Sequence, residues 1–195
     1  MRRSILIFLA VLACWPLGGF SQAQVATLAP VVPATKLESF DTNISTVVIK
    51  ATTQVGSLSV NSGIVSVRCR EVTDASNGHK EQGIAIAIAQ TGQDKDKLLI
   101  DYDEIPSLLN AIDYLNRLDF SVTPFNAFDA TFTTKGGFQI AAVGAQRTSA
   151  IYFSVRDVRT SLVPVMFSRD EVSRFRALID QAKTKLDSVR SGSGP

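Results

Sequence analysis

Apolar residues occur along this chain in short alternating or continuous runs bounded by turn residues, and this pattern predicts eight β-strands. Four of the runs precede a helical segment and four follow it. The expected strands cover residues 46–53 with an extension to 60, 64–72, 83–89, 97–102, 128–133, 137–143, 148–155 and 161–167. Asn61-Ser62-Gly63 and Lys135-Gly136-Gly137 supply hairpin turns, because glycine accepts the positive φ that such turns need.

The third expected strand, Gly83-Ile84-Ala85-Ile86-Ala87-Ile88-Ala89, carries isoleucine on one face and alanine on the other. Both of its faces are therefore apolar. We expect a second element of the protein to pack closely over the alanine side.

Two segments have the residue spacing of an amphipathic helix. The first has Asp103 as its expected N-cap and Pro106 in its first turn, where proline is tolerated. Its apolar stripe consists of Ile105, Leu108, Leu109, Ile112, Leu115 and Leu118. The second begins at Ser168-Arg169-Asp170-Glu171, which matches a capping box. Its apolar stripe consists of Val172, Phe175, Ile179, Ala182, Leu186 and Val189.

The two helical segments align when one is shifted by 67 residues along the sequence. The shift superimposes Asp103-Glu104-Ile105 on Asp170-Glu171-Val172, and Ile112-Asp113 on Ile179-Asp180. This match predicts an internal repeat, although any two amphipathic helices can be aligned on their stripes. The predicted fold class is α+β, with two ββββα repeats whose antiparallel sheets are each covered by one helix.

This order of elements resembles the tandem ββββα architecture of the PUR and Whirly proteins. The resemblance covers roughly residues 44–190 and rests on element order, since the lysine-rich KGKAAL-type strand motif of Whirly proteins is absent from the sequence. It implies repeats that pair through their sheets and helices. Because those families bind single-stranded nucleic acid, it also implies that activity as an alternative function, although a shared fold does not establish a shared function.

The N-terminus has the order of residues typical of a cleavable export signal. The positively charged Met1-Arg2-Arg3 is followed by the apolar run Ile5–Ala13 and by the small-x-small sequence Ser21-Gln22-Ala23. The apolar run is shorter than the roughly 20 residues of a membrane-spanning helix. We predict a signal peptide over residues 1–23, with cleavage between Ala23 and Gln24.

Two alternatives to simple cleavage remain open. In the first alternative, the N-terminal segment stays attached as an uncleaved membrane anchor. In the second alternative, Val11-Leu12-Ala13-Cys14 serves as a bacterial lipobox and Cys14 is lipidated. The expected location is periplasmic or secreted, with no spanning segment left after cleavage, or lipid-anchored through Cys14 in the second alternative.

The expected cleavage also sets the charge and the boundaries of the mature protein. Removing Arg2 and Arg3 from the 20 basic residues leaves 18, equal to the 18 acidic residues. A domain without net charge has no general electrostatic attraction to nucleic acid or anionic lipid, which argues against a nucleic-acid partner. We expect a linker over 24–36, a single domain over 37–190 with candidate repeats 44–119 and 126–190, and a disordered tail over 191–195.

Cys69 is the one cysteine outside the export signal, so an internal disulfide is excluded after cleavage. It shares one face of its strand with Val65 and Val67, which predicts a buried and inert thiol. The single histidine, His79, is interpreted as an exposed loop residue. One histidine cannot form an ordinary histidine-rich zinc site, and no Gly-x-Ser-x-Gly hydrolase motif is present.

Three further groups of residues admit a functional interpretation. Asp101, Asp103 and Glu104 offer oxygen ligands for a divalent cation, but helix capping explains them better. The mixed charges of the last helix indicate a solvated face, and their contrast with the acidic first helix suggests attraction between helices or subunits, hence a homodimer. We expect the aromatic group Phe120, Phe125, Phe128, Phe132 and Phe138 to pack in the core rather than to stack on bases.

No catalytic, cofactor-binding or metal-binding motif stands out in the sequence. We therefore expect no cofactor and assign no catalytic or metal-ligating residue. The favoured function is an exported, non-catalytic binding or structural domain whose partner is a protein or another envelope component. One alternative is a small-ligand carrier or hydrolase with a pocket between sheet and helices, lined by the isoleucine and alanine strand at 84–89. The other is the single-stranded nucleic-acid binding implied by the resemblance.

Overall fold

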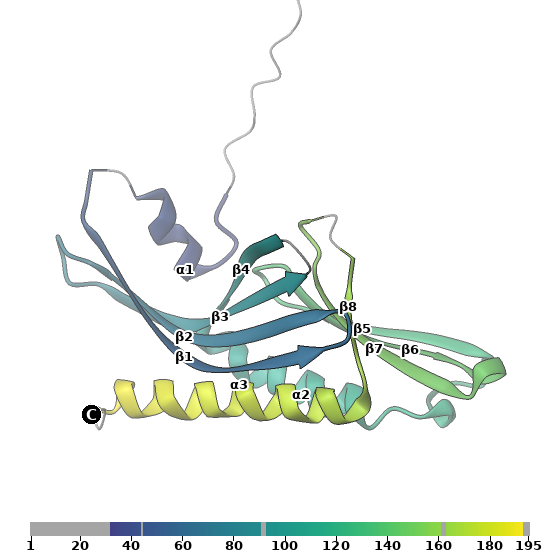
Figure 1. The fold of residues 1–195 in the computed structure, drawn as a ribbon. Coiled ribbons are helices and arrows are strands. Elements are labelled where there is room, and N and C mark those ends of the chain that lie inside the picture. Colours follow the sequence, from purple (N-terminus) through teal and green to yellow (C-terminus); the bar gives the residue numbers. More distant parts are fainter. Residues whose placement is uncertain (1–31, 44, 91–92, 161–162, 193–195) are drawn as a thin grey trace, which may run out of the picture. The chain divides into compact units, whose positions relative to one another are not determined.

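The computed structural model describes residues 32–43, 45–90, 93–160 and 163–192 (Figure 1). The predicted signal peptide, its cleavage residues Ala23 and Gln24, and the candidate lipidation residue Cys14 lie outside the described residues. Residues 24–31 of the expected linker and residues 193–195 of the expected tail also lie outside them.

Eight strands form two antiparallel sheets, as the hydrophobic pattern predicts. Sheet A has the order β1-β2-β3-β4, and sheet B has the order β5-β6-β7-β8. The strands of sheet A are β1 (Val48–Val60), β2 (Gly63–Asp74), β3 (Lys80–Gln90) and β4 (Gln93–Asp101). Those of sheet B are β5 (Ala127–Thr133), β6 (Phe138–Ala145), β7 (Ala150–Asp157) and β8 (Val165–Phe167). The predicted α+β class, with four strands and a long helix occurring twice, is confirmed.

The helices are α1 (Lys36–Ser39), α2 (Ile105–Asn116) and α3 (Arg169–Arg190). Four short 3₁₀ turns accompany them in the described part of the chain: Phe40–Thr42, Tyr102–Glu104, Phe120–Val122 and Gln146–Thr148. The seventh strand begins at Ala150 rather than 148, because the turn Gln146–Thr148 occupies the preceding residues. The last strand is confined to Val165–Phe167.

The two long helices begin differently. Ser168 forms the predicted capping box of α3, since its hydroxyl accepts from the Glu171 amide while the Glu171 carboxylate accepts from the Ser168 amide. The prediction that Asp103 caps α2 is wrong. Asp103 lies within the 3₁₀ turn, and its carboxylate binds the Lys36 ammonium at 3.1 Å, so α2 starts after Glu104 without a side-chain cap.

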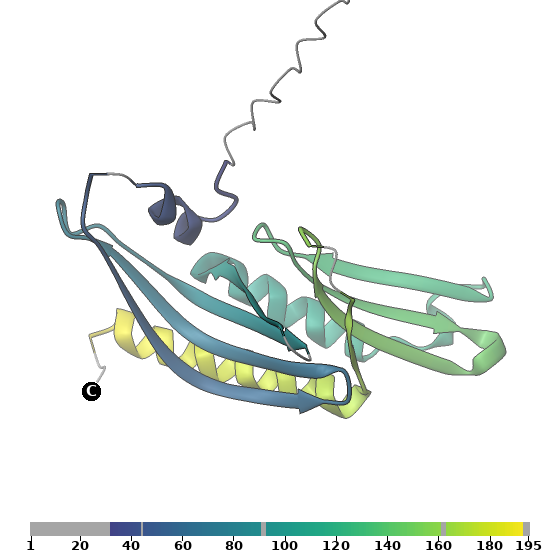
Figure 2. The same cartoon turned by 45° about the horizontal axis from the view of Figure 1, so that its top comes forward.

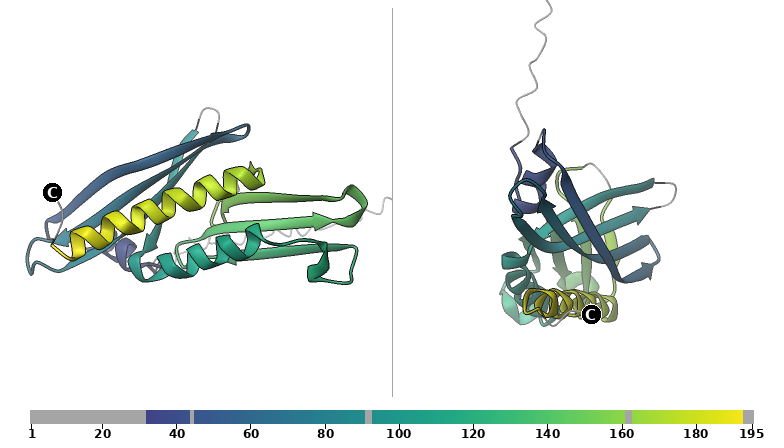
Figure 3. Two further views of the ribbon diagram at one scale, coloured as in Figure 1. Left: turned by 90° about the horizontal axis from the view of Figure 1, so that it is seen from below. Right: turned by 90° about the vertical axis from the view of Figure 1, so that its left-hand side faces the viewer.

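Each long helix lies against strands of the other four-stranded unit. Helix α3, which follows sheet B in the sequence, runs along β1 and β2 of sheet A, while α2 lies against β5 and β6 of sheet B (Figures 2 and 3). A β-bulge between Gln54 and Gly56 accompanies the close approach of β1 to α3. A Cβ atom at Gly56 would lie 2.6 Å from Cδ2 of Leu178.

One main hydrophobic core joins both sheets and both long helices. Phe175 of α3 contacts Phe138 of β6 and Phe167 of β8, with ring centroids 5.8 and 5.7 Å apart. The remaining predicted stripe of α3 is buried as well, except for Val189, which is 44 % exposed and lines a cavity described below. The first half of α3 therefore meets sheet B, and its second half covers sheet A.

Helix α1 covers part of the opposite face of sheet A. Leu37 and Phe40 form a second buried cluster with Val72, Ala85 and Leu99. The expectation that another element packs over the alanine side of β3 is confirmed at Ala85. Thr35, from the end of the expected linker, caps α1 and forms a capping box with Glu38.

No helix among the described residues is both long enough and apolar enough to cross a membrane.

Candidate functional site

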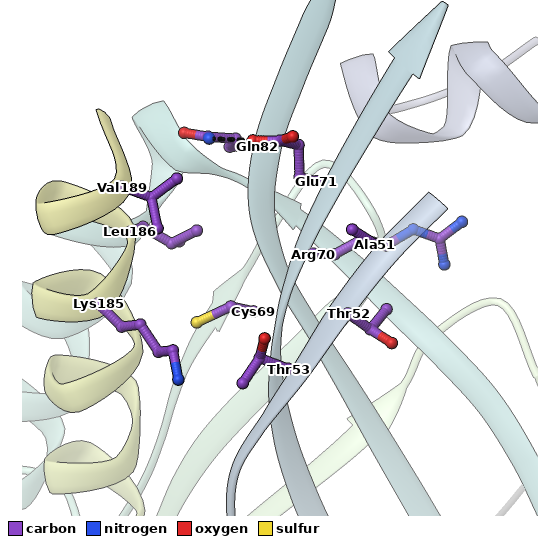
Figure 4. A pocket seen from close by; sticks show the side chains of 10 residues that line it. All are labelled: Ala51, Thr52, Thr53, Cys69, Arg70, Glu71, Gln82, Lys185, Leu186 and Val189. Carbon is purple, nitrogen blue, oxygen red and sulfur yellow. Dashed lines mark hydrogen bonds between the residues drawn. The ribbon is translucent and has the colours of Figure 1, made fainter. Parts of the chain in front are cut away.

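A cavity of about 190 Å³ lies between the last turns of α3 and the strands β1, β2 and β3 of sheet A (Figure 4). Helix α3 contributes its last two turns to one wall, and the strands form the other. The lining residues are Ala51, Thr52, Thr53, Cys69, Arg70, Glu71, Gln82, Lys185, Leu186 and Val189.

The strand register explains why these residues meet. Antiparallel pairing places Ala51, Glu71 and Gln82 in one cross-strand row, and Thr53 and Cys69 in a neighbouring row. Side chains in the same row share a face of the sheet, and this face is the one that α3 covers. Figure 4 shows the Cys69 and Gln82 side chains on the α3 side, whereas the Arg70 guanidinium extends away from it.

Gln82 is a buried polar residue whose side chain lies on the α3 side of the sheet (Figure 4), and it is only 8 % exposed. Its amide Nε2 donates to Glu71 Oε2 at 2.6 Å. Its Oε1 is buried and has no hydrogen-bond partner among the described residues. A buried acceptor without a partner costs roughly 1–3 kcal/mol, so a donor group placed in the cavity would recover part of that cost.

The Cys69 thiol forms part of the cavity wall. Its Sγ donates to the carbonyl oxygen of Ala182 at 3.5 Å, and the residue is buried as the strand pattern predicts. Burial raises the pKa of this thiol, and the nearby Lys185 ammonium opposes the shift to a smaller extent. The protonated thiol is therefore favoured, which is consistent with the prediction of an inert cysteine.

His79 is exposed, as expected. Its ring stacks on Phe40 with centroids 5.6 Å apart, and its Nε2 lies 3.4 Å from Glu81 Oε1. His79 is not among the residues that line the cavity, and it lies beside the segment that contains α1.

The three acidic residues before α2 bind two other parts of the chain, the start of α1 and the turn before β6. Asp101 accepts from the backbone amides of Lys36 at 2.8 Å and Leu37 at 3.1 Å. Asp103 binds the Lys36 side chain, and Glu104 accepts from the Lys135 amide at 3.0 Å. Among the described residues no group of three or more His, Cys, Asp or Glu side chains could hold a metal ion.

The expected attraction between the two long helices is present. Arg176 of α3 binds Asp113 of α2 through two hydrogen bonds. Asn116 of α2 donates to Ser173 of α3 at 3.0 Å. The charges of α3 thus serve helix packing at this point as well as solvation.

The aromatic group is only partly in the core. Phe138 is buried, and Phe128 and Phe132 are half-buried against the core. Phe120 is half-buried and contacts the Phe128 ring edge-on. The prediction is wrong for Phe125, which is 74 % exposed because it lies in the connection before β5, outside the alternation of the strand.

Sequence reasoning raised a pocket between sheet and helices only as an alternative and with other lining residues, and it missed an apolar face of sheet B that is exposed among the described residues. The signal for the cavity was Gln82, a polar residue on the same strand face as Ile84, where an apolar residue is expected. The signal for the face was Val143, Tyr152 and Met166 at positions that alternate with buried residues.

Comparisons with known proteins identify no family. No protein-family model matches the chain, and neither the curated proteins nor the solved structures contain a significant match. The resemblance to PUR and Whirly proteins is therefore limited to two four-stranded antiparallel sheets with helices.

Proposed function

We propose that this protein is an exported, non-catalytic binding domain that associates with a protein partner through the outer face of sheet B. The observation that supports this proposal is the group Val143, Tyr152 and Met166, which are 43, 52 and 46 % exposed on the face opposite the core. Export rests on the order of residues in the N-terminal segment 1–23.

The strand register places these three side chains close together. Val143 pairs directly with Tyr152, and Met166 pairs with Ser154, two residues further along β7. Their neighbours Phe153 and Val155 point to the opposite face and are buried in the core. The two cross-strand rows that contain the group include a single charged residue, Asp129, which lies opposite Val143 on β5.

The composition of this face favours a protein partner. Contiguous exposed apolar groups on a soluble domain mark interaction surfaces, and tyrosine and methionine are enriched in protein interfaces while most charged residues are depleted. The surface that binds here should therefore be largely apolar and uncharged. Nucleic acid is a poorer partner for the same face, because it would require basic side chains along a phosphate backbone.

The hydrolase and carrier alternatives predicted a pocket lined by the isoleucine and alanine strand. Ile84, Ile86 and Ile88 instead belong to the main core. We therefore do not propose hydrolysis. The small cavity that contains Gln82 of the same strand is considered separately below.

Site-specific crosslinking in the producing cell tests the proposal. A photoreactive phenylalanine at Tyr152 should capture a partner protein, and the same residue at the exposed Tyr114 of α2 should not capture it. The captured protein, once purified, should bind the Tyr152→Lys variant at least about tenfold more weakly than the wild type, since a charge at an interface core is costly. The Tyr114→Lys variant should bind normally.

Two results would contradict the proposal. Equal binding of the wild type and the Tyr152→Lys variant would exclude this face. A crosslinked dimer of the chain itself would identify a second copy, rather than a different protein, as the occupant.

A further inference from the structure

We propose that the cavity between α3 and sheet A binds a small neutral amphiphile, namely an apolar ring or short chain that ends in a hydroxyl group. This site is independent of the outer face of sheet B and goes beyond the proposed function. Its strand residues belong to sheet A, whereas Val143 and Tyr152 belong to sheet B.

The size of the cavity sets the size of the ligand. Its volume is about 190 Å³. An apolar cavity of about 150 Å³ in a protein accommodates one benzene molecule, so this cavity has room for about eight non-hydrogen atoms.

The walls of the cavity are mainly apolar. Ala51 contributes from β1, Cys69 from β2, and Leu186 and Val189 from α3. The partly exposed Val189 lies on the last turn of α3, where a ligand can enter without opening the main core. An apolar ring or chain of the ligand would contact these side chains.

A buried polar atom defines the other end of the ligand. Gln82 Oε1 lacks a donor among the described residues, and Gln82 lines the cavity. A ligand hydroxyl can donate a hydrogen bond to this oxygen. Gln82 is more than nine-tenths buried and offers an acceptor without a partner, which distinguishes the cavity from a simple packing defect.

The charges around the cavity favour a neutral ligand. The Glu71 carboxylate already accepts from Gln82 Nε2 and from Lys80 Nζ at 3.4 Å, and it would repel an anionic ligand. The Lys185 ammonium on the opposite wall would repel a cationic one. A hydroxyl carries no charge and supplies the missing donor.

Titrations with benzyl alcohol and toluene, which differ by one hydroxymethyl oxygen, test this proposal by ¹H–¹⁵N NMR on the full protein without its signal peptide. Benzyl alcohol should cause saturable shifts of the backbone amides of Thr53, Cys69, Gln82 and Val189. The Gln82→Met variant keeps the volume of the side chain and removes its acceptor. It should weaken benzyl alcohol binding by about threefold to tenfold, the usual effect of one hydrogen bond, and leave toluene binding unchanged or tighter.

Two further variants control this experiment. Gln181 is exposed on α3, so Gln181→Met should change neither affinity. Ala51→Phe, which fills the cavity from β1, should abolish the binding of both compounds. Toluene binding by the Gln82→Met variant shows that its cavity remains folded.

The proposal would be overturned by any of three results. Benzyl alcohol could produce no saturable shift at these four amides, which would mean that water alone fills the cavity. Gln82→Met could leave benzyl alcohol binding unchanged. The Gln82→Met substitution could also weaken the binding of benzyl alcohol and toluene equally, which would exclude a specific hydrogen bond. None of these results bears on sheet B.

Discussion

Arg176 binds Asp113 with both ends of its guanidinium group, Nε to Oδ1 at 3.0 Å and Nη2 to Oδ2 at 3.1 Å. The same guanidinium approaches Asp180 at 3.7 Å. Asp113 and Asp180 form one of the acidic pairs that the 67-residue shift superimposes. One arginine therefore contacts both equivalent positions of the two helices, and its hydrogen bonds with Asp113 raise its own pKa.

Asp113→Asn should destabilise the protein by about 0.5–1 kcal/mol, because the pair is bidentate but partly exposed. Urea unfolding measures this change. The effect should shrink in 1 M salt, which screens exposed charges. Asp180→Asn is the matched control and should cost less, since that contact is longer. Equal losses for the two variants would argue against a special role for the bond between the helices.

The α1 segment is held on sheet A by a buried carboxylate. Asp101 is only 2 % exposed and accepts two backbone hydrogen bonds from Lys36 and Leu37. Asp101→Asn should cost about 1.5–3 kcal/mol, the usual contribution of hydrogen bonds to a charged group. Amide hydrogen exchange at Lys36 and Leu37 should accelerate before the rest of the protein is affected.

Asp103→Asn serves as the control for this variant. Asp103 is half exposed and makes a surface ion pair with the Lys36 side chain. Its substitution should leave exchange at Leu37 nearly unchanged. Similar exchange in both variants would contradict the role assigned to Asp101.

The β2–β3 turn should confer acid sensitivity through Asp74. The Ser76 hydroxyl at 2.6 Å, followed by the Ser76 amide at 2.8 Å, lowers the pKa of Asp74 from its ordinary value near 3.8. A carboxyl with a lower pKa in the folded state stabilises the protein above its unfolded pKa. That stability is lost as the pH falls through the folded pKa.

Urea unfolding between pH 6 and pH 2 tests this expectation. The wild type should lose more stability below about pH 4 than Asp74→Asn, and Ser76→Ala should show an intermediate pH dependence. Parallel curves for the wild type and Asp74→Asn would show that Asp74 does not contribute.

Gly56 allows β1 and α3 to approach closely. Gly56→Ala should destabilise the protein by about 1–3 kcal/mol, because its Cβ would overlap the Leu178 side chain. In a Leu178→Ala background the same substitution should cost much less. A double-mutant cycle by urea unfolding measures this coupling. Additive effects would indicate that Gly56 is required for backbone conformation rather than for packing.

Cys69 should react slowly with thiol reagents in the folded protein. Burial limits access to the Cys69 thiol, and its raised pKa lowers the fraction present as thiolate. Methyl methanethiosulfonate at pH 8 should therefore modify Cys69 at least about tenfold more slowly than a free cysteine. Unfolding in urea should restore the normal rate, as measured by mass spectrometry. Modification at the rate of free cysteine would contradict the prediction that the thiol is inert.

Much of the secondary structure was predictable because its causes are local. The capping box at Ser168 involves residues three apart, and the Lys135-Gly136-Gly137 turn depends on Gly137, which has φ of +85°. The alternation around Cys69 likewise predicted which side chains are buried. Asp103 failed as an N-cap because a distant residue, Lys36, binds its carboxylate.

The sequence by itself determined the α+β class, the order of four strands and a helix occurring twice, and the apolar stripe that each helix buries. Only the tertiary structure decided which sheet each stripe covers, because a stripe specifies that a helix is buried but not against which partner. The cavity, too, was decided by the tertiary structure. Gln82, Cys69 and Leu186 come from three elements, and strand register and the placement of α3 bring them together.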